Sequence, residues 1–380
     1  MTPTAPEARR APATSIGSDG GLFDGEGQDG LRSAIDDGLE RVERLLHEEV
    51  VYADEIARVT ATYLMDAGGK RLRPMLALLT SQFGERPGHD DVIRAGAAVE
   101  ITHLASLYHD DVMDEADLRR GVAAAHLNWS NSVAILAGDL LFARSSLMFA
   151  ALGQRAIELQ ATTFERLVLG QMRETVGPKP GDDRIEHYIE VLADKTGSLI
   201  AAAAQFGAIC SGASEELVQP LADYGERVGV AFQIADDVID LSPRAEATGK
   251  LAGTDLRAGV ETLPVLLLDQ RAQGGDAEAA ALLERIRTEV AGTAKPRQLG
   301  APEPGQLADG VPGAEAQPAE DGAEIDAIVA QLREHPVTEQ TLAEARRWSD
   351  EAVAALAPLP DGPAKEALVA FARQVVERDR

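Results

Sequence analysis

Apolar residues recur every three or four positions along most of the chain. The stretch LRSAIDDGLERVERLLHEEV, which begins at Leu31, places its leucine, isoleucine and valine residues at this spacing. Such a period puts the apolar side chains on one face of an α-helix and predicts that this face is buried. The same pattern predicts helices over residues 51–67, 73–83, 92–115, 132–152, 156–175, 185–208, 215–241, 263–273, 276–290, 324–334 and 337–357, and a last helix from about residue 363.

No stretch alternates apolar and polar residues over the length of a strand, so the sequence predicts an all-α fold with many helices around one core. Residues 1–30 are rich in Pro, Gly, Ala and Asp without an apolar period, which predicts a disordered tail. A similar composition over about 296–322 predicts a disordered insertion in a domain that covers residues 31–380. The part after residue 322 is too short for a core of its own.

Composition narrows the class of protein. With 45% hydrophobic and 26% charged residues the chain is typical of a soluble globular protein, and its net charge of −27 argues against a nucleic-acid partner. The single cysteine, Cys210, excludes an internal disulfide and is expected to be a buried structural thiol. The first residues lack the apolar core of a signal peptide, and no uninterrupted apolar run is long enough to span a bilayer. We therefore expect a cytoplasmic protein that contacts a membrane at most peripherally.

Two short acidic groups interrupt apolar helical segments. They are DDVMD, with Asp110, Asp111 and Asp114, and DDVID, with Asp236, Asp237 and Asp240. On a helix, the outer aspartates of each group share one face and the middle aspartate lies at its edge. Like charges so close together favour a bound cation, and oxygen ligands without His or Cys favour Mg²⁺ held together with a substrate phosphate. A solvated helix face is the alternative for either group alone, but the apolar runs before both groups favour a cavity.

Basic side chains are scarce and gather in a few motifs. GGKRLRP contains Lys70, Arg71 and Arg73, LRRG contains Arg119 and Arg120, DKTGSL contains Lys195 and Thr196, and ATGKLAGTDL contains Lys250. Each alone could be an ordinary surface cation. Together with the two aspartate groups they suggest a site for two phosphorylated substrates, one held through Mg²⁺ and the other directly by lysine and arginine side chains.

In this order and spacing, the motifs resemble those of the trans-isoprenyl diphosphate synthases, the polyprenyl synthetase family, over about residues 60–270. The matching segments are GGKRLRP, EITHLASLYHDDVMDEADLRRG, AILAGDLLFA, GQMRE, DKTGSL and FQIADDVIDL. The chain is most similar to the long-chain polyprenyl diphosphate synthases that make quinone side chains. This similarity lies in the segment LYHDDVMDEADLRRG and in NSVAILAGD, which follows it. The resemblance implies a single isoprenoid-synthase-type helical bundle around a central cavity, a homodimer and about three Mg²⁺ ions.

The resemblance also implies a role for each matching residue. The expected metal set is Asp110, Asp111, Asp114, Asp236, Asp237 and Asp240, with Asp237 in a supporting place. The expected catalytic group consists of Lys195, Thr196, Gln233 and Lys250. These residues, and Arg119, match those that hold the allylic diphosphate in the family. The expected allylic substrate is farnesyl or geranylgeranyl diphosphate. Lys70, Arg73, His103 and Arg120 match the isopentenyl diphosphate site. One motif departs from the family, because GVETLP has Val260 where many relatives have lysine, and Arg257 is the expected substitute.

The implied reaction is the Mg²⁺-dependent head-to-tail condensation of isopentenyl diphosphate with an allylic diphosphate. In the family, bulky residues just before the first aspartate block the growing chain, whereas this chain has the small residues Ala105 and Ser106 there. We therefore predict an all-trans product between heptaprenyl and decaprenyl diphosphate. Met148 and Phe149 are interpreted as core residues rather than as the floor of the product site. The alternatives are a farnesyl or geranylgeranyl diphosphate synthase, a class I terpene synthase, and a non-catalytic subunit of a heteromeric synthase.

Overall fold

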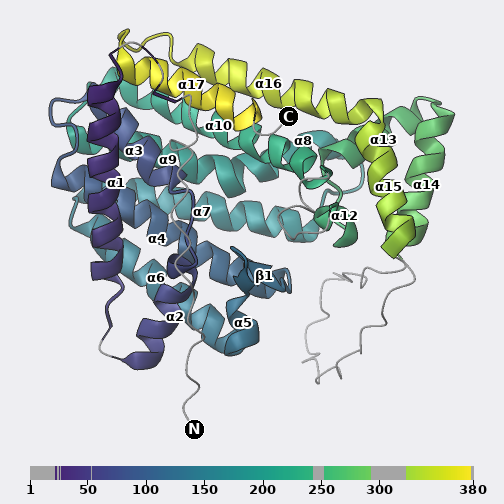
Figure 1. The fold of residues 1–380 in the computed structure, drawn as a ribbon, viewed down its shortest axis with the longest axis horizontal. Helices are drawn as coiled ribbons and strands as arrows, with labels where there is room; N and C mark the ends of the chain where they lie inside the picture. The colour runs from purple at the N-terminus through teal and green to yellow at the C-terminus, as the bar shows by residue number, and fades with distance from the viewer. Residues whose placement is uncertain are drawn as a thin grey trace. The chain divides into compact units, whose positions relative to one another are not determined.

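The computed structural model describes residues 22–23, 25, 27–52, 54–242, 252–291 and 322–377. Most of residues 1–30, residues 296–321 and Lys250 lie outside these ranges. The helices are α1 (Asp29–Glu49), α2 (Glu55–Asp66), α3 (Leu72–Thr80), η1 (Ser81–Phe83), α4 (Asp90–Met113), α5 (Ala125–Asn128), α6 (Asn131–Ala150), α7 (Gln154–Val176), α8 (Arg184–Leu192), η2 (Ala193–Gly197), α9 (Ser198–Ser211), α10 (Glu215–Asp240), α12 (Thr254–Arg257), α13 (Leu263–Gln273), α14 (Ala277–Ala291), α15 (Gly322–Glu334), α16 (Pro336–Ala355) and α17 (Pro363–Glu377) (Figure 1). Two short strands, β1 (Leu118–Arg119) and β2 (Val122–Ala123), form an antiparallel pair. The predicted all-α class is confirmed.

The chain divides into two compact units, and each is assembled from separate segments. The first unit comprises Met1–Leu169, Ala193–Gly229 and Ser349–Gln374, and the second comprises Gly170–Leu192, Val230–Trp348 and Val375–Arg380. The first aspartate group and the motifs GGKRLRP and LRRG belong to the first unit. The second aspartate group belongs to the second unit. The expected single bundle with a central cavity stays a prediction.

Helix α4 is the centre of the first unit, because it packs against α1, α3, α6 and α9. Its residues from Val92 to Tyr108 are mostly apolar or small, and most of them are buried. A helix that is covered on several sides needs apolar residues on all of those sides. The alanine-rich helix α9 approaches α3 closely at Gly207, where an added Cβ would lie 2.1 Å from the carbonyl oxygen of Ala77.

The residues just before α1 are in contact with the folded part of the chain. Leu22 and Phe23 are buried, and the guanidinium carbon of Arg32 lies 5.6 Å from the centre of the Phe23 ring. The side-chain amide of Gln28 donates to the carbonyl oxygen of Pro363 at 3.1 Å. The structure thus packs several residues that the sequence assigned to a disordered tail, because two apolar side chains there have partners to bury against.

Helix α6 belongs to the helical core of the first unit. Among the helices in the described ranges, it alone is long and apolar enough to cross a membrane. Core helices of soluble proteins also meet these two criteria. It packs along α4 and carries Asp139 and Arg144 within its length. Met148 and Phe149 are buried, and Phe149 stacks on Phe206 with ring centres 4.6 Å apart. Their interpretation as core residues is confirmed.

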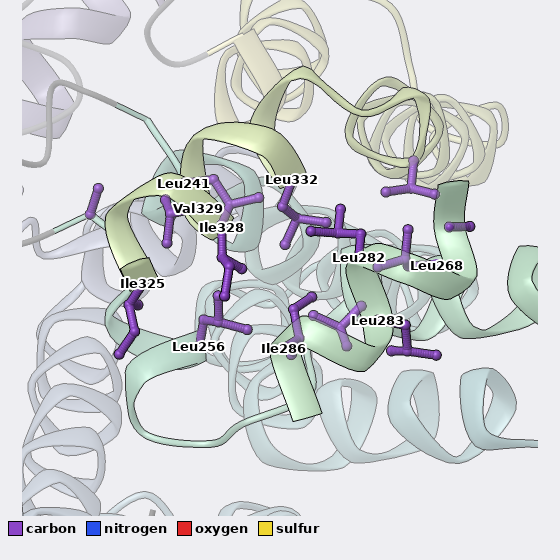
Figure 2. Packing of buried hydrophobic residues seen from close by; sticks show 14 residues of the cluster. Leu241, Leu256, Leu268, Leu282, Leu283, Ile286, Ile325, Ile328, Val329 and Leu332 are labelled. Atoms are coloured by element: carbon purple, nitrogen blue, oxygen red, sulfur yellow. The ribbon is translucent and has the colours of Figure 1, made fainter. Parts of the chain in front are cut away.

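A separate hydrophobic cluster forms the core of the second unit (Figure 2). It contains 14 buried side chains, among them Leu268 of α13, Leu282 of α14 and Ile328 of α15. Helix α13 packs on α14, and α14 packs on α15. The helical period of these segments places their leucine and isoleucine side chains on facing sides. The residues after 322 therefore share a core with helices that precede residue 292.

The periodicity did not predict two local structures, the hairpin after α4 and the π-helical turn before α9. Helix α4 ends at Met113, and Arg120 (φ 54°) and Gly121 (φ 77°) form the turn between β1 and β2. Positive φ at both central residues is the signature of a type I′ hairpin turn. The predicted helix 185–208 is divided by η2, a π-helical turn that contains Lys195 and Thr196. Such turns occur often at functional sites.

Candidate active site

The first aspartate group lies at the C-terminal end of α4. Asp110 is half-buried and Asp114 is exposed, one helical turn apart, whereas Asp111 is completely buried. The Oδ1 atom of Asp111 accepts a hydrogen bond from Arg119 Nε at 2.6 Å, and its Oδ2 atom is buried without a hydrogen-bond partner. Burial raises the pKa of the Asp111 carboxyl, and the charge of Arg119 opposes this. A buried carboxylate oxygen without a partner fits a cation at this end of the helix.

The β1–β2 hairpin gives its two consecutive arginines different partners. Arg119 reaches Asp111, while Arg120 Nη1 donates to the carbonyl oxygens of Leu64, at 2.8 Å, and of Gly68. Arg119 is the last residue of β1, whereas Arg120 lies in the turn with positive φ, and this change of backbone conformation separates their side chains. The hairpin therefore connects the first aspartate group to the segment between α2 and α3, which carries the motif GGKRLRP.

That segment contributes to a buried cluster of charged side chains. Arg71 binds Glu43 with two nitrogens, at 2.9 and 3.0 Å, and donates a third hydrogen bond to Glu100 Oε1 at 3.0 Å. Arg120 Nη2 lies 3.7 Å from the same oxygen of Glu100. Only 2% of the Glu100 side chain is exposed. This carboxylate therefore lies between two arginines that are far apart in the sequence.

Arg73 and His103 complete this cluster. The Nε atom of Arg73 is buried without a hydrogen-bond partner, and burial lowers the pKa of Arg73 to about 10, although Glu100 opposes the effect. Burial, and then the charges of Arg73 and Arg120, hold the pKa of His103 well below its usual range, so its imidazole is neutral. The structure thus brings together Arg73, His103 and Arg120 as predicted, while Lys70 is exposed beside them in the chain. The cluster has an excess of positive charge that suits a diphosphate.

The second aspartate group, at the C-terminal end of α10, shows the same division of roles. Asp236 and Asp240 are half-buried one turn apart, whereas 7% of Asp237 is exposed. Asp237 Oδ2 accepts hydrogen bonds from the Tyr188 hydroxyl and, at 3.2 Å, from the amide of Leu263 at the start of α13. Burial raises the pKa of the Asp237 carboxyl well above its usual range. These two protein donors on one oxygen are consistent with the supporting place predicted for Asp237, and its part in metal binding stays a prediction.

Asp240 also binds the backbone that follows it. Its Oδ1 accepts from the amide of Thr254 and its Oδ2 from the amide of Asp255, both at 3.1 Å. These bonds cap the short helix α12 at its N-terminus. Each carboxylate oxygen has a second lone pair, so the cap leaves room for a cation. The predicted role of Lys250, which precedes α12, falls on a residue outside the described ranges.

Arg257, the possible substitute for the missing lysine, already has partners within the second unit, and its role toward a diphosphate stays a prediction. Arg257 donates through Nε to the carbonyl oxygen of Ala252 at 3.1 Å and through Nη2 to the carboxylate of Asp326 in α15. Its guanidinium is therefore used to hold α12 against α15. Val260 itself is 41% exposed, and its side chain offers no charge to a diphosphate.

The remaining expected contacts to the allylic diphosphate are half-buried. Lys195 and Thr196 lie in the π-helical turn η2, and Gln233 lies on α10. In the first unit, a Cβ added at Gly229 of α10 would lie 2.7 Å from the Cα of Gly197. Two glycines therefore let η2 pack directly against α10. The roles of these three polar residues stay predictions.

The two expected chain-length residues differ in their surroundings. Ala105 is completely buried, and its carbonyl oxygen would lie 3.1 Å from a Cβ added at Gly138 of α6. Ser106 is half-buried and its hydroxyl donates to the carbonyl oxygen of His103 at 2.8 Å. Ser106 therefore shares the more open side of α4 with Asp110, whereas Ala105 lies in the contact between α4 and α6.

In the described ranges, no three Asp, Glu, His or Cys side chains converge closely enough to form a metal site by themselves. The metal roles of the aspartates therefore stay predictions. A phosphorylated ligand would supply oxygen atoms of its own, and Mg²⁺ is commonly held by one or two carboxylates together with such oxygens.

Sequence reasoning missed three residues of the site: Glu43, Glu100 and Tyr188. Glu100 carried a usable signal, because it is the single acidic residue in the apolar stretch before the first aspartate group. A carboxylate in the middle of a buried helix needs a cationic partner. Glu43 and Tyr188 come from helices distant in the sequence, and no local pattern connects them to their partners.

Comparison with known proteins identifies the family. The chain matches the polyprenyl synthetase family over residues 54–296. It belongs to this family. It is 41% identical over 346 residues to nonaprenyl diphosphate synthase of Mycobacterium tuberculosis, covering 91% of this chain and 94% of that protein. It is 33% identical over 319 residues to octaprenyl diphosphate synthase of Escherichia coli, covering 84% and 88%.

Solved structures of polyprenyl synthetases support the fold. The chain resembles the crystal structure of geranylgeranyl pyrophosphate synthase from Corynebacterium glutamicum, complexed with calcium and isoprenyl diphosphate, with 40% identity and a TM-score of 0.73. The match covers 93% of this chain and 98% of that one. The family resemblance carried by the motifs is therefore confirmed along almost the whole chain.

Proposed function

We propose that this polyprenyl synthetase condenses isopentenyl diphosphate with an allylic diphosphate and releases a long-chain, all-trans polyprenyl diphosphate. The observation that carries the proposal is the buried arginine cluster of the first unit, which holds an excess of positive charge and a neutral histidine. Such a cluster needs an anion. Similarity over most of the chain to proteins named nonaprenyl and octaprenyl diphosphate synthase supports the choice of isopentenyl diphosphate.

In this proposal the two substrates use different side chains. Arg73, Arg120, His103 and Lys70 bind the diphosphate of isopentenyl diphosphate directly. Lys195, Thr196, Gln233, Lys250 and Arg119 bind the diphosphate of the allylic substrate, farnesyl or geranylgeranyl diphosphate. His103 is neutral and can donate or accept one hydrogen bond in a cluster that already contains several cations.

The allylic diphosphate also needs divalent cations, and the aspartates fit them. The expected ligands are Asp110, Asp111 and Asp114 of the first group and Asp236 and Asp240 of the second. They would hold about three Mg²⁺ ions together with the diphosphate oxygens, and the unpartnered Oδ2 atom of Asp111 is available for this role. When bound, these ions stabilise the negative charge that develops on the leaving diphosphate. Asp111 and Asp237 orient the ends of α4 and α10 through Arg119 and Tyr188.

The chemical step needs no protein nucleophile. The allylic C–O bond breaks and its electrons leave with the diphosphate, while Arg119 and Lys195 stabilise that charge. The double bond of isopentenyl diphosphate then attacks the allylic cation. Loss of a proton from the adjacent carbon, with the released diphosphate as the proposed base, restores the double bond. Arg73 and Arg120 keep the second substrate in line for this attack.

The proposed product length rests on the small size of the residues that precede the first aspartate group on α4. Ser106 is small and lies on the open side of α4, so the growing chain is not blocked there. We propose a product between heptaprenyl and decaprenyl diphosphate, as used for quinone side chains. A geranylgeranyl product is the second candidate, because the similar structure from Corynebacterium glutamicum carries that name.

A homodimer is part of the proposal, because α6 and α7 expose apolar side chains. Leu136 and Leu147 of α6 are each 64% exposed, and Ile157 and Val168 of α7 are 42% and 43% exposed. The two helices are neighbours, since the rings of Phe142 and Phe164 lie 4.5 Å apart. A second copy of the chain would cover this apolar face. We place the enzyme in the cytoplasm, with at most peripheral membrane contact through its product.

One assay tests the function. Purified protein is incubated with farnesyl diphosphate, radiolabelled isopentenyl diphosphate and Mg²⁺, and products are separated by chain length. We expect products from heptaprenyl to decaprenyl, their loss on chelation with EDTA, and at least about 100-fold lower kcat for Asp110→Asn. Geranylgeranyl products would favour the second candidate. Cyclic hydrocarbons would indicate a terpene synthase, and no turnover would indicate a non-catalytic subunit.

A further inference from the structure

Glu100 is a buried carboxylate that contacts two arginines of the candidate site. Burying a carboxylate costs several kcal/mol unless cationic partners compensate it. Glu100 Oε1 accepts a hydrogen bond from Arg71 Nη1 at 3.0 Å and lies 3.7 Å from Arg120 Nη2. The same oxygen therefore connects the start of α3 with the turn of the β1–β2 hairpin.

Arg71 cannot serve a substrate in this arrangement, although it lies within the motif GGKRLRP. Its side chain is 7% exposed and its three nitrogens are engaged by Glu43, by Glu100 and by the carbonyl oxygen of Met65 at 3.4 Å. Its backbone has φ 49°, a left-handed conformation that is unfavourable in a residue with a side chain. The local strain is offset by these contacts, which fix the residue that begins α3.

The two cations that remain near Glu100 are the proposed substrate ligands. Arg120 is held by the carbonyl oxygens of Leu64 and Gly68 in addition to Glu100. Arg73 follows Arg71 by two residues on α3, and the pKa of its guanidinium responds to both Glu100 and Arg120. Without the carboxylate, these like charges would repel each other in a buried place.

We propose that Glu100 is a positioning residue that fixes Arg120 directly, and Arg73 through Arg71, at the spacing that binds the diphosphate of isopentenyl diphosphate. The inference rests on the proposed function, because it takes this cluster as the isopentenyl diphosphate site. Glu100 does not touch the substrate. Its effect is the order that it imposes on two arginines, so its loss should change substrate affinity more than the chemical step.

The chain offers a matched control for this role. Glu43 binds the same Arg71 with both carboxylate oxygens, but its side chain is 38% exposed, and of the two glutamates Glu100 is the one that lies beside Arg120. Glu43→Gln and Glu100→Gln remove one negative charge each and keep the side-chain shape. A general loss of charge balance or of stability would affect both variants, whereas loss of positioning would affect Glu100→Gln alone.

The test compares wild type and both variants in steady-state kinetics with isopentenyl diphosphate, farnesyl diphosphate and Mg²⁺. For Glu100→Gln we expect the KM for isopentenyl diphosphate to rise about tenfold or more, with the KM for farnesyl diphosphate within about twofold of wild type. For Glu43→Gln we expect both constants within about twofold. Calorimetric titration with isopentenyl diphosphate alone should show the same tenfold loss of affinity without turnover.

Three results would contradict the proposed role of Glu100 or the proposed function. Equal changes in both KM values, or a fall in kcat alone, would show that Glu100 has only a structural role and would overturn the inference. If Glu100→Gln does not fold, Arg71→Lys replaces it, because lysine keeps the charge but cannot bridge two carboxylates. That variant should show the same selective rise, and unchanged affinity for isopentenyl diphosphate would overturn the inference. If wild type itself makes no prenyl product, the proposed function fails instead.

Discussion

Asp111 and Asp237 occupy the same place in two aspartate motifs, and both are buried. Arg119 holds the first, while Tyr188 and the amide of Leu263 hold the second. In each motif one carboxylate thus fixes the end of its helix, and its neighbours stay accessible to a cation. The sequence alone cannot show this division, because its partners come from other parts of the chain.

His103 should make the protein sensitive to acid. Its pKa is lowered in the folded state by burial and by nearby arginines, so the unfolded chain takes up a proton first as the pH falls below about 6.5. Below this pH, protonation of His103 in the unfolded chain should lower the free energy of unfolding by up to about 1.4 kcal/mol per pH unit. Urea unfolding at pH 7.5 and 5.5 should show a larger loss for wild type than for His103→Gln. An identical loss in both proteins would contradict the assignment.

Ser106 rather than Ala105 should offer a clean test of product length. Ser106→Phe is expected to shorten the products because the new ring fills the open side of α4, with little loss of stability. Ala105→Phe must displace atoms in the contact between α4 and α6, which should cost about 1–3 kcal/mol of stability. Product chromatography and thermal unfolding of both variants measure the two effects. Unchanged product length in Ser106→Phe would refute the proposed route of the chain.

At the scale of elements, the long helices could be predicted and the short interruptions could not. The apolar period places α4, α6 and α13 within a few residues of their observed bounds, because burial of one face is a property of the local sequence. The hairpin around Arg120 and the π-helical turn η2 are shorter than one period and depend on tertiary contacts. Both carry expected site residues, so the least predictable elements are those closest to function.

The contact between α3 and α9 depends on the absence of a side chain at one position. A methyl group at Gly207 would lie 2.1 Å from both the carbonyl oxygen of Ala77 and the hydroxyl of Thr80. We expect Gly207→Ala to lower the free energy of unfolding by about 1–3 kcal/mol, measured by urea denaturation. Gly30→Ala is the control, because that helical glycine has nothing within 4 Å. It should be neutral or stabilising by about 0.5–1 kcal/mol.

For the whole molecule, the motifs predicted the family and the comparisons confirmed it. Arg73, His103 and Arg120, which the motifs placed in one substrate site, do lie together, while their role in binding isopentenyl diphosphate stays a prediction. The sequence did not predict that Asp326, distant from Arg257 along the chain, engages the Arg257 guanidinium. Pairings of this kind follow from the packed fold and leave no mark in the local pattern.

Substitutions on the exposed apolar face of α6 test the proposed homodimer directly. Leu136→Glu combined with Leu147→Glu should convert a dimer of 40.3 kDa subunits into monomers, because the charges would be buried without partners. Both side chains are 64% exposed in the single chain, so its fold should be unaffected. Light scattering after size-exclusion chromatography measures the mass. The matched control, Leu136→Met with Leu147→Met, should remain dimeric, and dimeric glutamate variants would exclude this face.

The charge excess in the arginine cluster has a thermodynamic consequence. Arg71, Arg73 and Arg120 face the carboxylates of Glu43 and Glu100, so the ligand-free fold contains more positive than negative charge in a poorly solvated place. A bound diphosphate, as proposed, would relieve this repulsion, and part of its binding energy would then appear as resistance to unfolding. At a hundredfold excess over its Kd a ligand adds about 2.7 kcal/mol. We therefore expect the melting temperature of the protein to rise as isopentenyl diphosphate occupies this cluster, and differential scanning calorimetry would measure the rise.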